Sequence, residues 1–202
     1  MTPPLPARPL AARLLATLRR LRRDEEGSMA IEGVLALPLL AWVYVGSFVF
    51  FDGFHAQSIK TKAGYTIGDV LSRETGYVTP AYMDSMYALQ GVLLDTEAAR
   101  RLRVSAVEYE ATGNKYLVRW SQVRGGGPAL TDAALAALRP QMPVMIDEEV
   151  IILTESWIDY VPAFDAGIDP FTFTDFVATR PRFASQICWN SQNNGGAATA
   201  TC

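Results

Sequence analysis

The stretch Gly27-Ser28-Met29-Ala30-Ile31-Glu32, which opens an apolar run that ends at Phe51, decides how this chain is organised. From Met29 to Phe51 the 23 residues include one charged residue, Glu32. As a helix the run is about 34 Å long, which exceeds the roughly 30 Å hydrocarbon core of a bilayer. It is apolar on every face, which favours a membrane span over a helix buried in a soluble core. A carboxylate near the end of such a span is costly and usually functional.

The surrounding sequence favours a retained span with a defined orientation. A cleavable secretory signal has a shorter apolar region of about 7–15 residues and then a small-x-small site, and no convincing site follows Phe51. Residues 1–23 hold six arginines and no acid. Only Lys60 and Lys62 follow the span within about 20 residues. The positive-inside rule therefore predicts a cytoplasmic N-terminus and an exported domain.

Composition limits the class of protein and its partners. A chain of 202 residues can hold one modest domain plus an anchor. From Asp52 onwards 17 acidic residues face 12 basic ones, a mixture too balanced for disorder and too acidic for nucleic acid. Trp120, Trp157 and Trp189 lack the interleaved basic residues of a nucleic-acid platform, so we expect them in core or edge packing.

The two cysteines, Cys188 and Cys202, lie in the part that we expect outside the membrane. Closing the flexible 13-residue segment between them is worth about 3 kcal/mol. A disulfide is therefore expected in an oxidising periplasm, with two free thiols as the alternative. One histidine with two cysteines is a poor zinc set, and no metal site is predicted.

The pattern along the chain predicts three regions. Residues 1–27 form a basic cytoplasmic leader, in which 10–23 is either an amphipathic helix at the membrane surface or unstructured. Residues 28–72 form a transmembrane and stalk helix, with apolar residues recurring after the span and with Gly64 and Gly68 each costing about 1 kcal/mol. Pro38 lies in its apolar part, where proline is tolerated. Residues 73–202 form the exported domain.

The exported domain is predicted to be α+β, with the N-terminal helices against one face of an antiparallel sheet of about four strands. Thr79 and Pro80 predict a helix that ends near Leu94. A hairpin follows at 102–109 and 116–121, with a phase shift that indicates a bulge. The remaining expected elements are a Thr131-capped helix at 132–139, a strand at 149–160, a loop at 162–170, and a last strand within 171–185. Pro181 should interrupt that strand and place it at an edge.

Enzyme signatures are missing, so we predict no catalytic residue and no cofactor. His55 is the one histidine and is read as a polar residue at the membrane interface, with a serine-dependent site as the alternative. Asp147, Glu148 and Glu149 form an acidic cluster before a strand. A metal site needs convergent ligands, and no such set is recognisable in this part of the sequence. We therefore interpret the cluster as a solvated turn.

The junction itself resembles the type IV prepilin pattern, in which a glycine precedes an apolar run and a glutamate is the fifth residue after it. In that family a membrane aspartyl peptidase cuts after the glycine, which implies cleavage between Gly27 and Ser28. Glu32 would then lie in the membrane near the amino terminus of an adjacent subunit. That pairing would offset its insertion cost of about 2.5–3.5 kcal/mol. The alternative is that Glu32 sits at the interface and snorkels.

The resemblance narrows to TadE/TadG-like pilus-assembly proteins on three motifs near the N-terminus and one near the C-terminus. These are Arg23 to Glu32 (Arg-Asp-Glu-Glu-Gly-Ser-Met-Ala-Ile-Glu), Leu37-Pro38-Leu39-Leu40, Phe51-Asp52-Gly53 and Thr179-Arg180-Pro181-Arg182-Phe183. Glu32 favours the TadE-like side, because the TadG type usually lacks this glutamate. In the family an aromatic residue often follows the glutamate, whereas Gly33 follows it here.

This resemblance implies a pilin-like fold and a non-enzymatic role as a minor pilin or pseudopilin of a Flp-type (tight-adherence) pilus in the bacterial inner membrane. The implied partners are a prepilin peptidase, the major pilin and other minor pilins, the inner-membrane assembly platform and the lipid bilayer. An uncleaved periplasmic scaffold of the same machine and a membrane-tethered enzyme remain alternatives. The aromatic segment 164–176 is a candidate contact surface, with core burial as the alternative.

Overall fold

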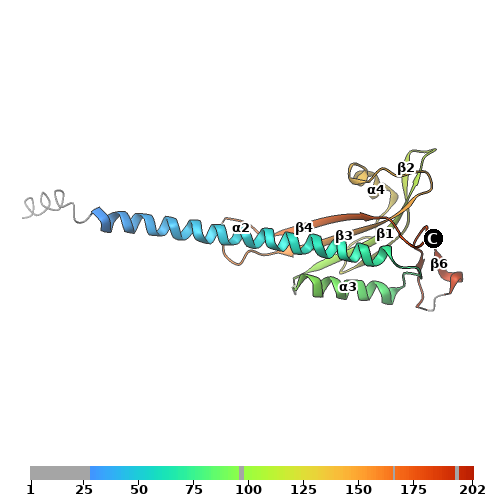
Figure 1. Cartoon of the computed structure of the whole chain (residues 1–202), viewed down its shortest axis with the longest axis horizontal. Coiled ribbons are helices and arrows are strands. Elements are labelled where there is room, and N and C mark those ends of the chain that lie inside the picture. Colours follow the sequence, from blue (N-terminus) through green and yellow to red (C-terminus); the bar gives the residue numbers. More distant parts are fainter. Residues whose placement is uncertain (1–27, 96–97, 166, 194–195) are drawn as a thin grey trace, which may run out of the picture. The chain divides into compact units, whose positions relative to one another are not determined.

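The computed structural model describes residues 28–95, 98–165, 167–193 and 196–202 (Figure 1). The predicted leader, with its possible helix at 10–23 and with Gly27, lies outside the described residues. The chain divides into two compact units, Met1–Val49 and Phe50–Cys202. Each unit is described by itself.

The first unit consists, in its described part, of the N-terminal half of helix α2 (Ser28–Ser72), which continues through Pro38. Its large apolar side chains are mostly exposed, as at Met29, Leu35 and Trp42. Within the described residues, α2 from Met29 is long and apolar enough to cross a membrane. Exposed apolar surface of this extent is normally covered by lipid or by another protein.

The second unit is α+β, as the sequence predicts. Its elements after α2 are α3 (Pro80–Leu94), β1 (Arg100–Glu110), β2 (Lys115–Arg124), α4 (Asp132–Leu138), a 3-10 turn (Arg139–Gln141), β3 (Val150–Tyr160), β4 (Phe171–Thr179), β5 (Trp189–Asn190), a second 3-10 turn (Ala197–Thr199) and β6 (Ala200–Thr201). Strands β1 to β4 form an antiparallel sheet in the order β2-β1-β3-β4. The predicted four-stranded antiparallel sheet is thus confirmed.

The bulge predicted in β1 lies in β2 instead: the register shifts between Ala106 and Val107 because β2 has an extra residue there, Arg119. Before the bulge, Leu102 and Val104 join the core on one face of the sheet. After it, Val107 joins the core on the other face. This is the ordinary two-residue alternation of β1, which continues across the bulge. The period shifts in β2, where Val118 and Trp120 join opposite faces although they are two residues apart.

Helix α3 and the C-terminal half of α2 cover one face of the sheet (Figure 1). Their buried side chains include Ile67 and Leu71 from α2 and Met83 from α3. The predicted N-terminus of α3 is confirmed, because the Thr79 hydroxyl accepts a hydrogen bond of 3.2 Å from the Tyr82 backbone N–H.

Helix α2 lies against β4 through two of its glycines, Gly64 and Gly68. A Cβ atom on Gly64 would lie 2.6 Å from Asp175 Oδ2, and one on Gly68 would lie 2.8 Å from Thr179 Oγ1. Both glycines also face Val177 between these two residues, at 3.3 Å from Gly64 and 3.4 Å from Gly68. The glycines, which the sequence marks only as a cost to the helix, allow this close approach.

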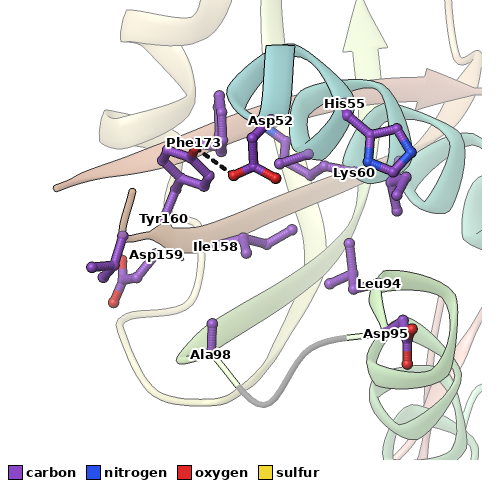
Figure 2. Close-up of a pocket in the computed structure, with 13 residues that line it drawn as sticks. Asp52, His55, Lys60, Leu94, Asp95, Ala98, Ile158, Asp159, Tyr160 and Phe173 are labelled. Atoms are coloured by element: carbon purple, nitrogen blue, oxygen red, sulfur yellow. Dashed lines mark hydrogen bonds between the residues drawn. The ribbon is translucent and has the colours of Figure 1, made fainter. Parts of the chain in front are cut away.

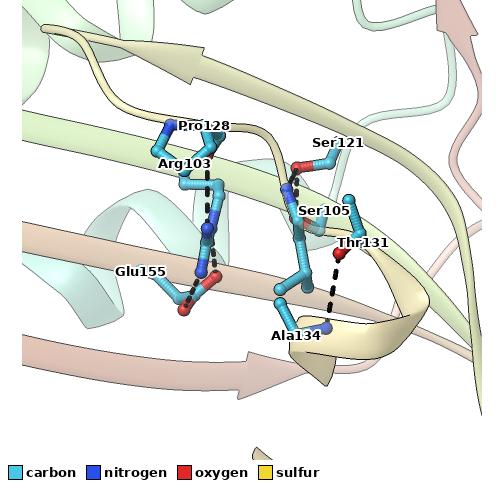
Figure 3. Close-up of polar contacts among 8 residues, drawn as sticks. Arg103, Ser105, Ser121, Pro128, Thr131, Ala134 and Glu155 are labelled. Carbon is cyan, nitrogen blue, oxygen red and sulfur yellow. Dashed lines mark hydrogen bonds and ion pairs between the residues drawn. The ribbon is translucent and has the colours of Figure 1, made fainter. Parts of the chain in front are cut away.

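The opposite face of the sheet is covered by α4 and its flanking loops, around Leu130, Leu135 and Met145. The predicted Thr131 cap accepts a hydrogen bond from Ala134 N–H at 3.3 Å. Figure 3 shows polar groups of the sheet near α4. The Arg103 guanidinium donates two hydrogen bonds of 2.6 Å to the Glu155 carboxylate. Arg103 also holds the loop before α4 in place, because it donates a hydrogen bond of 3.3 Å to the Pro128 carbonyl.

The C-terminal segment departs from the prediction in one respect. Strand β4 lies at the sheet edge, as expected, but it ends at Thr179. Pro181 therefore follows the strand and does not interrupt it, because the chain has already left the ladder: Arg182 N–H donates to the Ser72 carbonyl at 2.8 Å. The last strand thus lies within 171–185 as predicted, and only its interruption by Pro181 was wrong.

Candidate functional site

A pocket of about 450 Å³ lies in the second unit where α2 has just left the apolar segment (Figure 2). Asp52, the first residue after Phe51, and Lys60 both line it, so it occupies the first two to three turns beyond that segment. Parts of α2, of the end of α3, of the chain just before β1 and of strands β3 and β4 contribute to its wall. The lining residues are Asp52, His55, Ala56, Ile59, Lys60, Leu94, Asp95, Ala98, Ile158, Asp159, Tyr160, Val161 and Phe173.

One side of the pocket is fixed by a hydrogen bond between helix and sheet. The Tyr160 hydroxyl donates to Asp52 Oδ2 at 2.7 Å. The Tyr160 ring packs against Phe171 and Phe173, with ring centroids 5.4 and 5.5 Å apart. Burial and the hydrogen bond to Asp52 raise the pKa of Tyr160 to about 12. The phenol is therefore a neutral donor at physiological pH.

Lys60 is a cationic side chain in the pocket wall that is only 3% exposed. Its Nζ lies 5.1 Å from the centroid of the Phe173 ring, which faces it as a cation–π partner. Among the described residues it makes no hydrogen bond or ion pair. It lies nine residues beyond Phe51, outside the apolar segment, and burial lowers the pKa of its ammonium while Asp175 opposes that shift.

Asp175 on β4 is the carboxylate that acts most strongly on Lys60. Its Oδ2 atom is buried and has no hydrogen-bond partner in the described structure. Burial raises the pKa of this carboxyl, and Lys60 opposes the shift. Lys60 and Asp175 therefore carry opposite charges without a direct ion pair, and the half-buried Asp175 lacks a hydrogen bond at Oδ2.

The rest of the polar lining lies at the rim. Asp159 accepts a hydrogen bond of 2.6 Å from the Thr172 hydroxyl. His55 is exposed and, within the described residues, makes no hydrogen bond or ion pair, so the geometry gives it no nucleophile to activate. Asp95 ends α3 with a positive φ of 47°.

The residues singled out at the junction lie apart from the pocket along the chain. Gly27 is outside the described residues, and Ser28 is in α2. Glu32 is exposed on the first turns of that helix.

Cys188 and Cys202 form the expected disulfide. It closes the segment that carries β5 and β6, and Asn190 is buried within that segment. Backbone hydrogen bonds from Val78 N–H to the Cys188 carbonyl (2.9 Å) and from Asn190 N–H to the Val78 carbonyl (2.8 Å) join this segment to the start of α3. The tail is thus part of the folded unit.

The acidic cluster at 147–149 forms a turn in which two of its carboxylates have structural partners. Asp147 Oδ1 accepts from Ala111 N–H at 2.7 Å. Glu149 pairs with Arg180 and accepts from Ile146 N–H at 2.9 Å. In the described part of the chain no group of three or more His, Cys, Asp or Glu side chains converges as a metal site would require.

Two sequence interpretations need correction. Trp157 does have basic neighbours, because the guanidinium carbons of Arg101 and Arg103 each lie 5.0 Å from its ring centroid. These contacts come from pairing of β1 with β3, which spacing along one strand does not reveal. The aromatic segment 164–176 is also not one loop: strand β4 begins at Phe171, and Phe171 is 42% exposed.

Lys60 is the pocket residue that the sequence reasoning missed. It lies three residues before Ala63, on the stripe of buried α2 residues that continues through Ile67 and Leu71. A lone lysine on such a stripe is the signal that could have identified it. Comparisons of this chain with protein-family models, with curated proteins and with solved structures found no match.

Proposed function

We propose that this protein is a minor pilin or pseudopilin that takes part in assembly of a Flp-type (tight-adherence) type IV pilus and is anchored in the bacterial inner membrane. The observation that carries the proposal is the junction: a glycine, an apolar helix, and Glu32 as the fifth residue after Gly27. An exposed carboxylate on a helix with exposed apolar side chains supports it, because such a surface fits contacts with lipid and with other helices.

In this proposal a prepilin peptidase cuts between Gly27 and Ser28 and removes the six leader arginines. The new amino terminus of one subunit then pairs with Glu32 of the next, which offsets the cost of about 2.5–3.5 kcal/mol for a carboxylate in lipid. Only one register brings the two charges together, so the pair also selects the packing of subunits. The domain after the span is exported and contacts the major pilin and other minor pilins.

The mature N-terminus tests the processing step. The full chain is produced in cells with and without the prepilin peptidase of the same pilus machine, and its N-terminus is read by mass spectrometry. A start at Ser28 that depends on the peptidase supports the proposal. A Gly27→Leu variant, whose side chain obstructs the tight site, should keep the leader. An intact leader on the natural sequence in cells that carry the peptidase excludes the pseudopilin function.

The glutamate tests the assembly step. Glu32→Ala should abolish incorporation or pilus formation, because the span keeps its length but loses its pairing charge. Glu26→Ala is the matched control, since Glu26 lies on the leader side of the proposed cut and leaves with the leader. If both variants assemble pili normally, an uncleaved scaffold of the same machine becomes the better account.

A further inference from the structure

Every buried side-chain nitrogen or oxygen that lacks a hydrogen-bond partner among the described residues lies between the sheet and the helices α2 and α3. These atoms are Gln90 Oε1, Arg100 Nε, Thr154 Oγ1 and Asp175 Oδ2. The Arg100 side chain lies against α3, and the Asp175 side chain lies against α2. Thr154 alternates on β3 with Ile152, which belongs to the core beneath the helices. A buried polar atom without a partner costs free energy that contact with water would restore.

Helix α2 meets the sheet in two halves of different character. In the core half, Ile67 and Leu71 are almost fully buried in the main hydrophobic cluster, which Ile152 of β3 also joins. The pocket half is formed by residues 52–64 of α2. Among the described residues its hydrophobic cluster has three buried members, against twelve in the main cluster. The pocket of about 450 Å³ also lies in this half, which is therefore the less well packed of the two.

Polar groups lie in the pocket half, where apolar side chains would hold helix and sheet together more strongly. Ser156 on β3 is 3% exposed and pairs with Asp175 on β4, on the face of the sheet that α2 covers. Burial lowers the pKa of Lys60 and raises the pKa of Asp175, so the closed interface disfavours the charged form of both groups. Because hydration favours these charges, water entry lowers the free energy needed to separate α2 from the strands here.

One hydrogen bond closes the pocket half at Asp52, which accepts from the Tyr160 hydroxyl at 2.7 Å. At the other end of this half lies Gly64, and glycine makes a helix easier to deform. We propose that residues 52–64 of α2 separate from β3 and β4 in the native protein while the core half stays packed, and that the hydrogen bond between Tyr160 and Asp52 is the latch of the closed form. Opening exposes the sheet face that carries Ser156. This device goes beyond the proposed function and depends on neither cleavage nor pilus assembly.

Cysteine probes in the full chain, kept in mild detergent with the natural disulfide oxidised, measure the opening. Ser156→Cys places a thiol beneath the pocket half, and Ala106→Cys places one in the main cluster. Modification by excess iodoacetamide is followed by mass spectrometry at increasing urea, and the rate expected from global unfolding is calculated from each variant's own denaturation curve.

Ser156→Cys should react about 100-fold or more above its global rate, whereas Ala106→Cys should react at its global rate. The rate for Ser156→Cys should not depend on urea below the unfolding transition, because a local opening exposes little surface. Ala63→Cys, on the α2 side of the pocket half, reports the same opening if Ser156→Cys does not fold.

The latch is tested in the same cysteine variant. Tyr160→Phe removes the donor and should speed modification about tenfold. Tyr109→Phe is the matched control, because it removes a tyrosine hydrogen bond of 3.0 Å to Asn114 outside this interface, and it should change the rate less than about twofold. Thr154→Val removes an unpartnered hydroxyl from the closed interface and should slow modification about tenfold. Modification of Ser156→Cys only at its global rate, or a rate that Tyr160→Phe leaves unchanged, overturns the proposal.

Discussion

The Tyr160 hydroxyl donates a hydrogen bond of 2.7 Å to Asp52, which joins the end of strand β3 to the first residue of α2 beyond the apolar segment. Hydrogen bonds to charged groups are worth about 1.5–3 kcal/mol. Tyr160→Phe keeps the ring contacts with Phe171 and Phe173 but removes the donor. We expect it to lower the free energy of unfolding by about 1–2 kcal/mol, measured by urea denaturation of the full chain in detergent.

A double-mutant cycle isolates this contact. If the bond is formed, Asp52→Asn combined with Tyr160→Phe should cost less than the sum of the two single changes. In Asp52→Asn the pKa of Tyr160 should also fall from about 12, because one cause of its elevation is removed. Strict additivity together with an unchanged tyrosine titration would contradict the contact.

The close approach of α2 and β4 makes a second prediction. Gly64→Ala places a Cβ atom 2.6 Å from Asp175 Oδ2 and 3.3 Å from Val177 Cγ2. Overpacking of this kind costs about 1–3 kcal/mol, which exceeds the roughly 1 kcal/mol that alanine gains in a helix. Gly64→Ala should therefore lower the urea midpoint.

Gly53→Ala is the control for this change, because the same helix carries it and its nearest contact is an ordinary 3.7 Å to the Tyr160 hydroxyl. It should leave the midpoint unchanged or raise it slightly through helix propensity. A Gly64→Ala protein as stable as the Gly53→Ala protein would mean that helix and strand do not pack as closely as described.

The disulfide between Cys188 and Cys202 closes a short loop at the end of the chain. Loop-closure entropy for about 15 residues corresponds to about 3 kcal/mol. The variant with both cysteines changed to serine should lose about that much stability, and a reductant should lower the midpoint of the natural sequence to the same value. The reductant should not affect the serine variant. A natural sequence that is insensitive to reductant would contradict a stabilising role for the bond.

Much of this fold could be predicted because local signals and short-range pairing define it. The Thr79 side chain that caps α3 and the hairpin of β1 and β2 depend on residues close in sequence. The disulfide could be predicted from the two cysteines and the inferred compartment. The sequence indicated a bulge in this hairpin but assigned it to β1, whereas the extra residue, Arg119, lies in β2.

The pocket could not be predicted, because it is formed by parts of α2, of the connection between α3 and β1, of the end of β3 and of β4, which are far apart in sequence. Tyr160 and Asp52 are 108 residues apart, and no periodic pattern connects them. The pairing of Arg101 with Trp157 depends on the register between β1 and β3, which the hydrophobic pattern alone does not define. Gly64 is read as a helix-weakening residue until the strand beside it is known.

The acidic turn gives a prediction for pH. The Arg180 guanidinium, through its hydrogen bond, lowers the pKa of the Glu149 carboxyl below its usual value of 4.5. A carboxyl with a lowered pKa in the folded state adds stability that is present above its unfolded pKa and is lost as pH falls through the folded pKa. Glu149→Gln should therefore be less stable than the natural sequence at pH 7. The difference in urea midpoint between the two proteins should disappear below about pH 4. Glu148→Gln is the matched control, because Glu148 is an exposed neighbour in the same turn, and it should leave the urea midpoint at pH 7 unchanged. A gap for Glu149→Gln that stays constant from pH 7 to pH 3 would mean that the charge pair does not stabilise this turn.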